Sequence, residues 1–598
     1  MSNSASLAYY WDIIDAIVRS RGGKTQKYHY FEEFWHTIED THKNRLIILQ
    51  APTGAGKTEA TLTPFLWDLI NGERRWHSLL YVLPTRSLVF NMFYRICKTL
   101  NVCKQLFEVP RVVIDYDYGG FIPFKAFLEG DITVTTYDTL VYTFYGFRSY
   151  GHHLLLSVGK ISGSFVILDE VQLLQDSQWY SLTLLPYHIA NLVTFGATVI
   201  LMTATLPRIL TEEIFEALEI PTLRWNIKHP YVSVNTDPNK NVIRRGKLDV
   251  FTEDGCLLNN VSKIARDYEK PLLLVFNTVE RAVEAYRSLV DSGYGNARLL
   301  HSRLVSEERK IREEFFEKNP SSPDLIVVAT QVVEAGIDYD FKTIATEISP
   351  VDSLIQRLGR CARRSDGEAI VYMDWKQAEH VYPRKVIEET IKVIDTNSLA
   401  ESVRNVSVAS NLINSVYRKE TVEELRNEEL EELKRTLGFL KTFSEKIFYS
   451  RNLVEDRALG LLRLGIEIRC ILLPQNIYQV VLKRLEVSKD DARINFPSNQ
   501  TIDLITKNHL SLSIRKLRRD LDVPALKHKV GGGEFYLTIF SSASEKDKDE
   551  IVFKVNKYSD LFTALKSNSW RISSLFIINP SYYLVERDYH LGLVKPYG

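Results

Sequence analysis

The chain has 598 residues, more than the ~250–300 residues at which a single hydrophobic core stops growing, so we expect several domains. Its 75 Lys and Arg residues balance 75 Asp and Glu residues, so no global positive field indicates a nucleic-acid partner, and any such site has to be a local channel. The five cysteines have no CxxC spacing, which argues against a zinc or iron–sulfur site and a disulfide scaffold. The N-terminus lacks the pattern of a signal peptide, and no apolar run approaches the ~18 residues of a membrane span, so we expect a cytoplasmic protein without a membrane partner.

Short apolar runs alternate with helix-length segments through the first part of the chain. The runs are RLIILQ, SLLYVLP, ITVTT, SFVILD and ATVILMTAT, and each of the first four is followed by a segment of helical character. This alternation is typical of an α/β domain with a doubly wound parallel sheet. We assign residues 1–45 to an N-terminal helical extension and residues 46–228 to the first domain.

The same alternation restarts after a stretch rich in Asn, Pro and charged residues, which predicts a linker over residues 229–246. The runs PLLLVFN, RLLHS, DLIVVAT, TIATEIS and EAIVYMDW predict a second α/β domain over residues 247–378. It contains no Gly-Lys-Thr sequence, so it is not a second copy of the nucleotide site proposed below for the first domain.

The remainder of the chain has a different pattern. Residues 379–447 are expected to be helical, and residues 448–598, which mix strand-like runs with a triple glycine, to form an α+β accessory region. Within the helical segment, apolar residues mark one side: Leu425, Leu430, Leu433, Leu437 and Leu440. This side belongs either to an interaction helix or to a solvated helix with one buried face, and the second interpretation is the more common one.

The segment APTGAGKT joins the first apolar run to a helical segment and resembles a phosphate-binding loop. The glycines let backbone amides turn toward an anion, and the helix that follows presents its positive end. The residues expected to contact the nucleotide are Thr53, Gly54, Ala55, Gly56, Lys57 and Thr58. Lys57 would reach the β- and γ-phosphates, and the Thr58 hydroxyl would bind Mg²⁺. The alternative, an ordinary turn that contains glycine, does not explain the combination of strand, Gly-Lys-Thr and helix.

The segment LDEVQ places two adjacent carboxylates at the end of another apolar run. Open α/β sheets bind ligands at the carboxyl ends of their strands, so these acids are expected close to the phosphate-binding loop. Asp169 would hold Mg²⁺ directly or through water, and Glu170 would act as general base on the attacking water. A surface acid pair that merely ends a strand is the alternative, and the upstream Gly-Lys-Thr argues against it.

The second domain contributes the segment QRLGRCARR, in which Gln356, Arg360 and Arg363 are candidate catalytic residues. Arginines spaced i and i+3 share one face of a helix, so both could point at one triphosphate. An arginine from a separate domain stabilises the transition state only when the cleft closes, which would couple hydrolysis to domain motion. A basic surface helix is the alternative.

Taken in order, these segments resemble the motifs of superfamily 2 helicases. Besides the segments above, PTRSL, VTTYDTL, TATLP, VFNTVERA, LLHSR and VATQVVEAGIDYDF match, and the ending INPSYYLVERDYHLGL looks like the tail of one branch. The combination most resembles the helicase of type I CRISPR interference. The resemblance implies two tandem RecA-like domains, ATP and Mg²⁺ as cofactors, and ATP-dependent translocation on single-stranded DNA with duplex unwinding. It covers residues 45–375 strongly and the rest weakly.

The resemblance also implies roles for individual residues. Positions that hold the nucleic-acid backbone are Thr85, Arg86, Thr135, Thr136, His301, Ser302, Arg303 and Thr330. Thr203 and Thr205 match the motif that couples the nucleotide site to the strand-bound cleft, and Gly336 and Asp338 match residues near the ATP ribose. For Thr85 and Arg86 in the segment PTR, the start of a capped helix explains the residues as well as nucleic-acid binding does.

Two features depart from the family pattern. Gln172 stands where many relatives carry His, and we expect its neutral amide to bridge the acid pair to the TAT loop or to the second domain. In place of the glutamine that reads adenine, KYHYFEEFW offers aromatic residues, and Gln26 lies too far upstream.

The family's usual nuclease is an HD domain whose metal site needs a His-Asp dipeptide, and none of the thirteen histidines precedes Asp. We therefore expect a motor without its own nuclease, which works with single-stranded DNA, a separate HD nuclease polypeptide and an effector complex that carries guide RNA. The alternatives are a generic superfamily 2 DNA-repair or RNA helicase, and a clamp that binds ATP without unwinding.

Overall fold

The computed structural model describes most of the two α/β domains and parts of the C-terminal region. The described residues are 3–19, 25, 29–39, 45–51, 55–117, 127–146, 154–174, 179–203, 206–219, 231–235, 246–319, 322–334, 339–426, 430–446, 467–488, 491–495, 498–513, 522–530, 533–541, 550–556, 574–587 and 589–594. Within them, no helix is long and apolar enough to cross a membrane.

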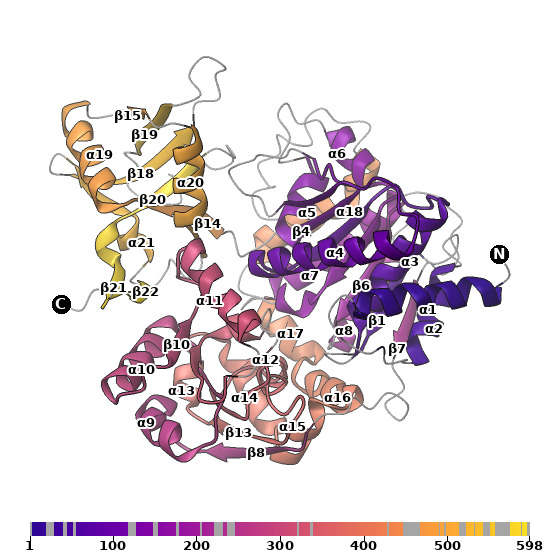
Figure 1. Cartoon of the computed structure of the whole chain (residues 1–598), viewed down its shortest axis with the longest axis horizontal. Helices are drawn as coiled ribbons and strands as arrows, with labels where there is room; N and C mark the ends of the chain where they lie inside the picture. The colour runs from indigo at the N-terminus through magenta and orange to yellow at the C-terminus, as the bar shows by residue number, and fades with distance from the viewer. Residues whose placement is uncertain are drawn as a thin grey trace.

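The first domain is built on a seven-stranded parallel sheet (Figure 1). In spatial order its strands are β3 (Ile114–Asp117), β4 (Ile132–Thr136), β2 (Leu79–Leu83), β5 (Phe165–Asp169), β6 (Thr198–Thr203), β1 (Leu46–Gln50) and β7 (Tyr231–Asn235). The central strands are apolar along their length because helices cover both faces of the sheet. The register pairs Gln50 with Thr203 and Asp169 with Met202, so strands β5, β6 and β1 end side by side.

The helices of the first domain lie on both faces of this sheet (Figure 1). They are α1 (Asn3–Arg19), α2 (His29–Glu39), α3 (Lys57–Asn71), α4 (Arg86–Leu106), α5 (Tyr137–Phe144), α6 (Leu154–Ile161), the 3₁₀ turn η2 (Val171–Leu174), α7 (Tyr180–Thr194) and α8 (Arg208–Glu219). The N-terminal helices are part of the core: Tyr10 and Trp35 are fully buried in the cluster that includes the inner face of α3. Strand β7 lies inside the segment expected to be a linker and pairs with β1, so the first domain extends to at least Asn235.

The second domain has a six-stranded parallel sheet and no seventh strand among its described residues. Its strands, in spatial order, are β10 (Ala297–Leu300), β11 (Ile326–Ala329), β9 (Leu272–Val275), β12 (Thr343–Glu347), β13 (Gly367–Tyr372) and β8 (Leu248–Glu253). The helical segments are α9 (Leu257–Asp267), α10 (Val279–Asp291), α11 (Ser306–Lys318), η3 (Gln331–Val333), α12 (Val351–Leu358) and α13 (Trp375–Ala378). The expected fold, two tandem doubly wound parallel sheets, is confirmed.

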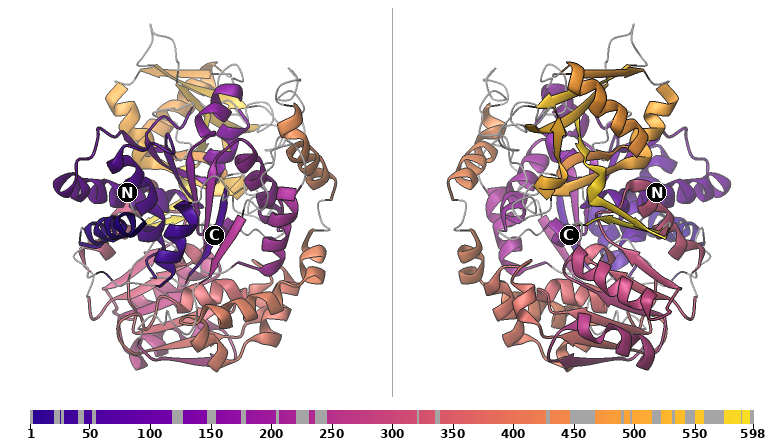
Figure 2. Two further views of the ribbon diagram at one scale, coloured as in Figure 1. Left: turned by 90° about the vertical axis from the view of Figure 1, so that its right-hand side faces the viewer. Right: turned by 90° about the vertical axis from the view of Figure 1, so that its left-hand side faces the viewer.

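A helical region then connects the two domains on one flank. It comprises α14 (Arg384–Val393), α15 (Thr396–Ser402), α16 (Val406–Val416), α17 (Lys419–Arg426) and α18 (Leu430–Lys446). Helix α16 packs on α12 of the second domain and α18 packs on α7 of the first, and Figure 2 shows the segment rising from one to the other. Leu433 and Leu440 are buried, which confirms the interpretation of a helix with one buried face.

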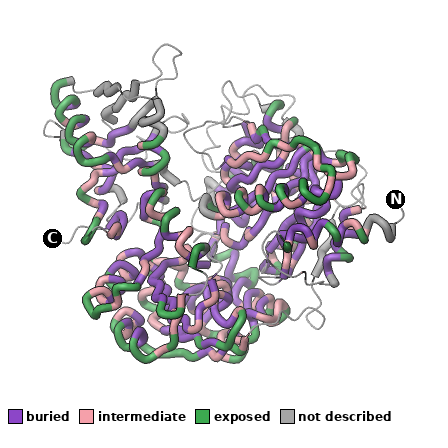
Figure 3. The backbone as a smooth tube through the Cα atoms, viewed as in Figure 1, coloured by how far each residue is buried: buried purple, intermediate pink, exposed green. Residues whose placement is uncertain are grey.

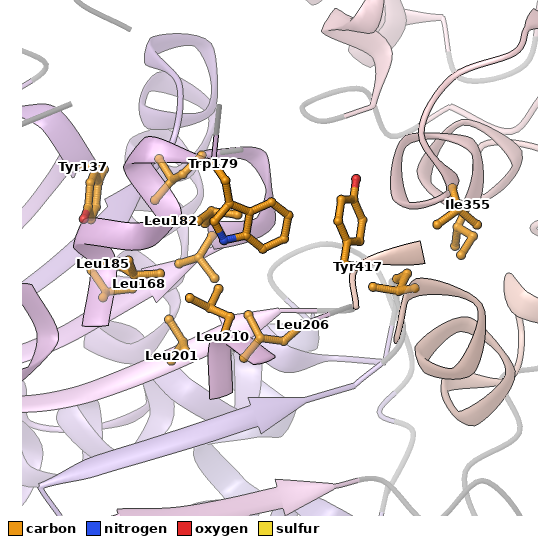
Figure 4. Packing of buried hydrophobic residues seen from close by; sticks show 14 of the residues in the cluster. Tyr137, Leu168, Trp179, Leu182, Leu185, Leu201, Leu206, Leu210, Ile355 and Tyr417 are labelled. Carbon is orange, nitrogen blue, oxygen red and sulfur yellow. The ribbon is translucent and has the colours of Figure 1, made fainter. Parts of the chain in front are cut away.

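One residue of this region contacts both domains. The ring of Tyr417 lies 4.8 Å from that of Trp179 in the first domain (Figure 4). Its hydroxyl donates a 2.7 Å hydrogen bond to Oδ1 of Asp352 in α12. All three side chains are buried. In Figure 3 the purple, buried stretches of the tube run through the interior of both α/β domains. The core of the first domain is thus continuous with that of the second through Tyr417.

The C-terminal region contains a mixed, mostly antiparallel sheet and a separate hairpin. The sheet strands, in spatial order, are β15 (Asp491–Asn495), β19 (Glu550–Asn556), β18 (Gly533–Ser541), β20 (Ser574–Ile578), β14 (Glu467–Leu472) and β16 (His509–Ser513), with β17 (Lys527–Val530) on β18. Its helical segments are α19 (Gln475–Ser488), α20 (Ser498–Asn508), α21 (Asp522–Ala525) and η7 (Pro580–Tyr582). The hairpin of β21 (Tyr583–Glu586) and β22 (Tyr589–Leu593) lies against the second domain. This α+β region agrees with the expected fold class.

Candidate ATP-binding and nucleic-acid sites

Aromatic side chains from α2 hold the described part of the phosphate-binding loop. Gly56 has φ 78°, a left-handed conformation that glycine adopts without strain, and a Cβ there would lie 2.8 Å from the ring of Phe31. The hydroxyl of Tyr30 donates a 2.6 Å hydrogen bond to the carbonyl of Ala55. The aromatic residues that stand in place of an adenine-reading glutamine therefore support the loop itself.

Lys57 and Thr58 open α3 and are both buried. The ammonium of Lys57 donates a 2.8 Å hydrogen bond to the carbonyl of Ala51 at the end of β1. Because the first N–H groups of a helix have no partner within it, this end of α3 combines a positive dipole with the lysine charge. The geometry suits an anion at the carboxyl edge of the sheet.

Asp169 ends β5 at the same edge and is held by a residue that the sequence analysis did not identify. The hydroxyl of Tyr81, on the neighbouring strand β2, donates a 2.7 Å hydrogen bond to Oδ2 of Asp169. Burial and the adjacent Glu170 carboxylate raise the pKa of Asp169, whereas Tyr81 and the charge of Lys57 lower it. Tyr81 also interacts with the hydroxyl of Thr58, so one buried phenol lies between the two side chains expected at the metal.

Gln172 connects the acid pair to β6. Its amide nitrogen donates to a carboxylate oxygen of Glu170, and its amide oxygen accepts a 2.6 Å hydrogen bond from the hydroxyl of Thr203. Glu170 has φ 52°, an uncommon conformation for a residue other than glycine, and η2 follows it directly. The amide makes the bridge to the TAT loop that the sequence led us to expect.

Arg360 and Arg363 do not lie on a helix, so the expectation of a shared helical face is wrong. Helix α12 ends at Leu358, and the chain beyond it turns so that Cys361 pairs with Phe341 in an isolated parallel bridge. Because Cys361 pairs with Phe341, the chain leaves the helical conformation before it reaches the two arginine positions. Both residues stand in a turn beside the amino ends of β12 and β13.

In this turn the arginines contact backbone and acid groups of the second domain. A guanidinium nitrogen of Arg360 donates to the carbonyl of Glu334, and the backbone N–H of Arg363 donates a 2.9 Å hydrogen bond to Oδ1 of Asp340. Gln356 is half-buried on α12. Five further candidates lie outside the described residues: Thr53, Gly54, Thr205, Gly336 and Asp338.

Arg357 is the centre of a buried polar network that the sequence analysis did not assign. Its side chain is fully buried and forms an ion pair of 2.8 Å with Glu334. It also donates 3.0 Å hydrogen bonds to Oδ1 of Asn277 and to the hydroxyl of Tyr382. Burial raises the pKa of Glu334, and the Arg357 charge opposes that shift. The only feature of the sequence that could have indicated this network is that Asn277 and Glu334 follow predicted strands. The network holds α12 in place, and with it the turn that carries Arg360 and Arg363.

The threonines expected to hold a nucleic-acid backbone differ in accessibility. Thr135, Thr136 and Thr330 are buried, and the first two bond within the protein: Thr135 donates to the carbonyl of Asp117, and Thr136 caps α5. Thr85 is exposed at the start of α4, and its side chain makes no capping hydrogen bond there. Arg86 is the first residue of that helix.

The placement of His301 contradicts the expectation of a direct nucleic-acid contact. Its ring is fully buried and bonds at both nitrogens, to the carbonyl of Leu591 at 2.9 Å and to the backbone N–H of Arg303 at 3.2 Å. Burial and the charge of Arg312 lower the pKa of His301 to about 3. Ser302 is exposed, and Arg303 is half-buried with its guanidinium on Glu280. The loop therefore offers Ser302, and not the imidazole, to a ligand.

Comparison with known proteins agrees with this architecture. Residues 34–213 match the DEAD/DEAH box helicase family, and residues 268–366 match the C-terminal part of the CRISPR-associated nuclease/helicase Cas3. The chain is 25% identical over 474 residues to the CRISPR-associated helicase Cas3 of Thermoproteus tenax, covering 75% of this chain and 78% of that protein. It is 24% identical over 443 residues to the CRISPR-associated nuclease/helicase Cas3 of Methanothermobacter thermautotrophicus, covering 67% of this chain but only 50% of that protein.

Among solved structures, T. fusca Cas3 with AMPPNP has the same fold, with a TM-score of 0.61 at 17% identity, covering 87% of this chain and 71% of that one. The first of the matching families falls on the domain with the phosphate-binding loop and acid pair, and the second on the domain with the arginine turn. The chain is an ATP-dependent helicase, and over most of its length it is similar to CRISPR-associated Cas3 helicases.

Proposed function

We propose that the chain hydrolyses ATP in order to move along single-stranded DNA and to unwind duplex target DNA in CRISPR interference. The observation that carries this proposal is the meeting of Lys57, Asp169 and Thr203 at one sheet edge, where β1, β5 and β6 end side by side. The Gln172 bridge from Glu170 to Thr203 gives the acid pair a contact with the segment expected to respond to the bound strand.

The residues at this edge suit Mg²⁺ and ATP. Thr58 and Asp169 supply a hydroxyl and a carboxylate, the hard oxygen ligands that Mg²⁺ prefers, and both reach the Tyr81 hydroxyl. When bound, the ion neutralises charge on the phosphate oxygens. Lys57 would bind the β- and γ-phosphates, and the backbone N–H groups at the start of α3 would bind phosphate oxygens.

Glu170 is proposed as the group that accepts the proton of the attacking water. Its carboxylate is held by the Gln172 amide, which fixes its orientation without adding a charge. Arg360 and Arg363 are proposed to approach the γ-phosphate from the second domain when the cleft closes, and the buried Arg357 network holds the turn that carries them.

Three partners are proposed: single-stranded DNA, a separately encoded HD nuclease and an effector complex with guide RNA. The chain spans 78% of a relative named as a helicase and half of one named as a nuclease/helicase.

The test is the ATPase rate with single-stranded DNA, single-stranded RNA, duplex DNA or no nucleic acid, followed by strand displacement with and without ATP. We expect stimulation by single-stranded DNA and displacement that needs ATP. Lys57→Ala and Glu170→Gln serve as controls, because the first removes the phosphate-binding cation and the second removes the base but keeps its size. Stimulation by RNA alone would indicate an RNA helicase, and DNA binding without displacement would indicate a clamp; either result rejects the proposal.

A further inference from the structure

The C-terminal hairpin lies directly along the loop that follows β10. The carbonyl of Leu591 accepts from the ring of His301, and the backbone N–H of Leu593 donates a 2.9 Å hydrogen bond to the carbonyl of Arg303. Two residues further on, the N–H of Val305 donates to the hydroxyl of Tyr583 at 3.3 Å. Strands β21 and β22 thus contact the loop at residues 301, 303 and 305, on either side of the exposed Ser302.

Gly592 makes this close approach feasible. Its φ of 85° is left-handed, and a Cβ at this position would lie 2.6 Å from Cε1 of His301 and 2.7 Å from the carbonyl oxygen of Arg303. The second neighbour is backbone, so it cannot move aside as a flexible side chain would. Any other residue would therefore push β22 away from the loop.

Tyr589 anchors the other end of β22 on the second domain. Its hydroxyl accepts a 3.0 Å hydrogen bond from the N–H of Leu299 in β10, and its ring stacks on that of Tyr286 at 4.9 Å. The guanidinium of Arg312 lies 4.2 Å from the centre of the Tyr589 ring. The same guanidinium donates to the carbonyls of Leu299, at 2.7 Å, and of His590, at 2.6 Å. Arg312 is buried, so these bonds are protected from water.

We propose that the hairpin positions the loop of residues 301–303 for binding of single-stranded DNA, with Gly592 and Tyr589 as positioning residues that do not touch the strand. The inference rests on the proposed function, since it assumes that Ser302 faces the DNA backbone. Without the hairpin contacts, the loop would lose the partners of His301 and of the Arg303 carbonyl. DNA binding would then have to order the loop, and that cost would weaken affinity.

Gly592→Ala is the direct test, and Gly293→Ala is its matched control. Gly293 lies in the second domain after α10, also with a left-handed φ (91°), but a Cβ there meets nothing within 4 Å. Both variants carry the same backbone strain, and only the first disturbs the loop. We expect Gly592→Ala to weaken affinity for a fluorescent oligonucleotide about tenfold and to raise the DNA concentration for half-maximal ATPase stimulation similarly. The ATPase rate without DNA and the KM for ATP should match those of Gly293→Ala.

Tyr589→Phe provides a milder variant if Gly592→Ala unfolds the hairpin. It removes the bond to the Leu299 N–H but keeps both rings stacked, and we expect about a threefold loss of DNA affinity at unchanged basal ATPase. Equal DNA affinity in Gly592→Ala and Gly293→Ala, with Tyr589→Phe like the parent, would overturn the inference.

The variant Ser302→Glu distinguishes an error in the positioning role of the hairpin from an error in the proposed function. A carboxylate at the exposed Ser302 would repel a phosphate backbone. If Ser302→Glu weakens DNA binding while Gly592→Ala does not, the loop contacts DNA and only the positioning role is wrong. If Ser302→Glu has no effect on a chain that binds DNA, the loop is not on the DNA path, and both the loop assignment and the inference fail.

Discussion

The hydroxyl of Tyr81 donates a 2.7 Å hydrogen bond to Oδ2 of Asp169 across the boundary between β2 and β5. Both side chains are buried, and burial together with the nearby Asp169 raises the pKa of Tyr81 well above 10, so the phenol remains a donor at every physiological pH. Tyr81 therefore presents a fixed proton to a carboxylate that also lies close to Glu170. One oxygen of Asp169 is held in place, and the expected metal site has a fixed geometry.

Tyr81→Phe should weaken Mg²⁺ binding more than it weakens folding. The ring remains in the core, but Asp169 loses a hydrogen bond that contributes about 1.5–3 kcal/mol when the acceptor is charged. We expect the Mg²⁺ concentration for half-maximal nucleotide binding to rise several-fold, measured by the fluorescence of a labelled ATP analogue under titration. Tyr116→Phe, on the edge strand β3, is the control. Unchanged Mg²⁺ dependence would exclude Tyr81 from the metal site.

Gln172→Ala should separate hydrolysis from unwinding. Lys57, Asp169 and Glu170 all remain, so ATP binding should hold and hydrolysis should persist at a reduced rate. The link from Glu170 to Thr203 is lost, so we expect fewer base pairs opened for each ATP consumed, measured by parallel ATPase and strand-displacement assays. Gln172→His, which places another hydrogen-bonding side chain at this position, should recover most of this ratio. If Gln172→Ala opens as many base pairs per ATP as the parent, the bridge does not couple the two activities.

The chemistry at the sheet edge was predictable from the sequence because each motif directly follows an apolar run. Parallel strands place their carboxyl ends together, so the neighbourhood of Lys57 and Asp169 follows from the strand pattern alone. Tyr81 could not be found this way, because it lies inside an apolar strand and its role depends on which strand is adjacent. His301 was wrongly assigned for a similar reason: the strand that buries it lies 290 positions further along the chain. The end of α12 before Arg360 likewise depends on a pairing with Phe341.

Arg357→Met should destabilise the second domain while leaving the first domain folded. The substitution leaves Glu334 buried without its partner, and breaking a buried ion pair in this way costs about 3–5 kcal/mol. The measurement is urea unfolding, with Arg266→Met, at an exposed ion pair, as the control that should change stability by less than about 1 kcal/mol. The double variant Arg357→Met with Glu334→Gln should recover part of the loss. Additive effects in the double variant would show that the two charges do not act as a pair.

Acid should weaken the hairpin contact through His301. Its pKa falls from 6.5 to about 3 on folding, so the neutral ring stabilises the fold fully above pH 6.5, and this contribution is lost as the pH falls from 6.5 toward 3. At pH 5 the loss is about 2 kcal/mol. The positive groups that face the ring, Arg303, Arg309 and Arg312, act in the same direction. In urea unfolding, the stability advantage of the parent over His301→Gln should therefore be about 2 kcal/mol smaller at pH 5 than at pH 7.5. A constant difference between the two pH values would show that His301 does not titrate on unfolding.

The last prediction concerns Arg360 and Arg363 and tests the two-domain mechanism. If both reach the triphosphate when the cleft closes, each supplies charge stabilisation that is present only in the transition state. Arginine fingers contribute ~10³–10⁵ in rate, so Ala at either position should reduce hydrolysis by orders of magnitude. Arg360→Lys should not restore hydrolysis, because an ammonium lacks the planar guanidinium geometry that binds two phosphate oxygens at once.

These variants keep the residues of the first domain that bind ATP, so ATP affinity should hold within about tenfold, ~1.4 kcal/mol. Arg364→Ala is the matched control, since Arg364 is exposed and adjacent in the same turn, and its backbone N–H bonds to the same Asp340. The turn is held by backbone bonds and by the Arg357 network rather than by a helix, so removing either side chain should not unfold it. The competing interpretation, a basic surface that binds DNA, predicts near-normal hydrolysis and DNA binding that is weaker and more sensitive to salt. Measuring turnover, ATP affinity and DNA affinity on Arg360→Ala, Arg363→Ala and Arg364→Ala decides between them, because only the arginine-finger mechanism lowers turnover in the first two while both affinities remain.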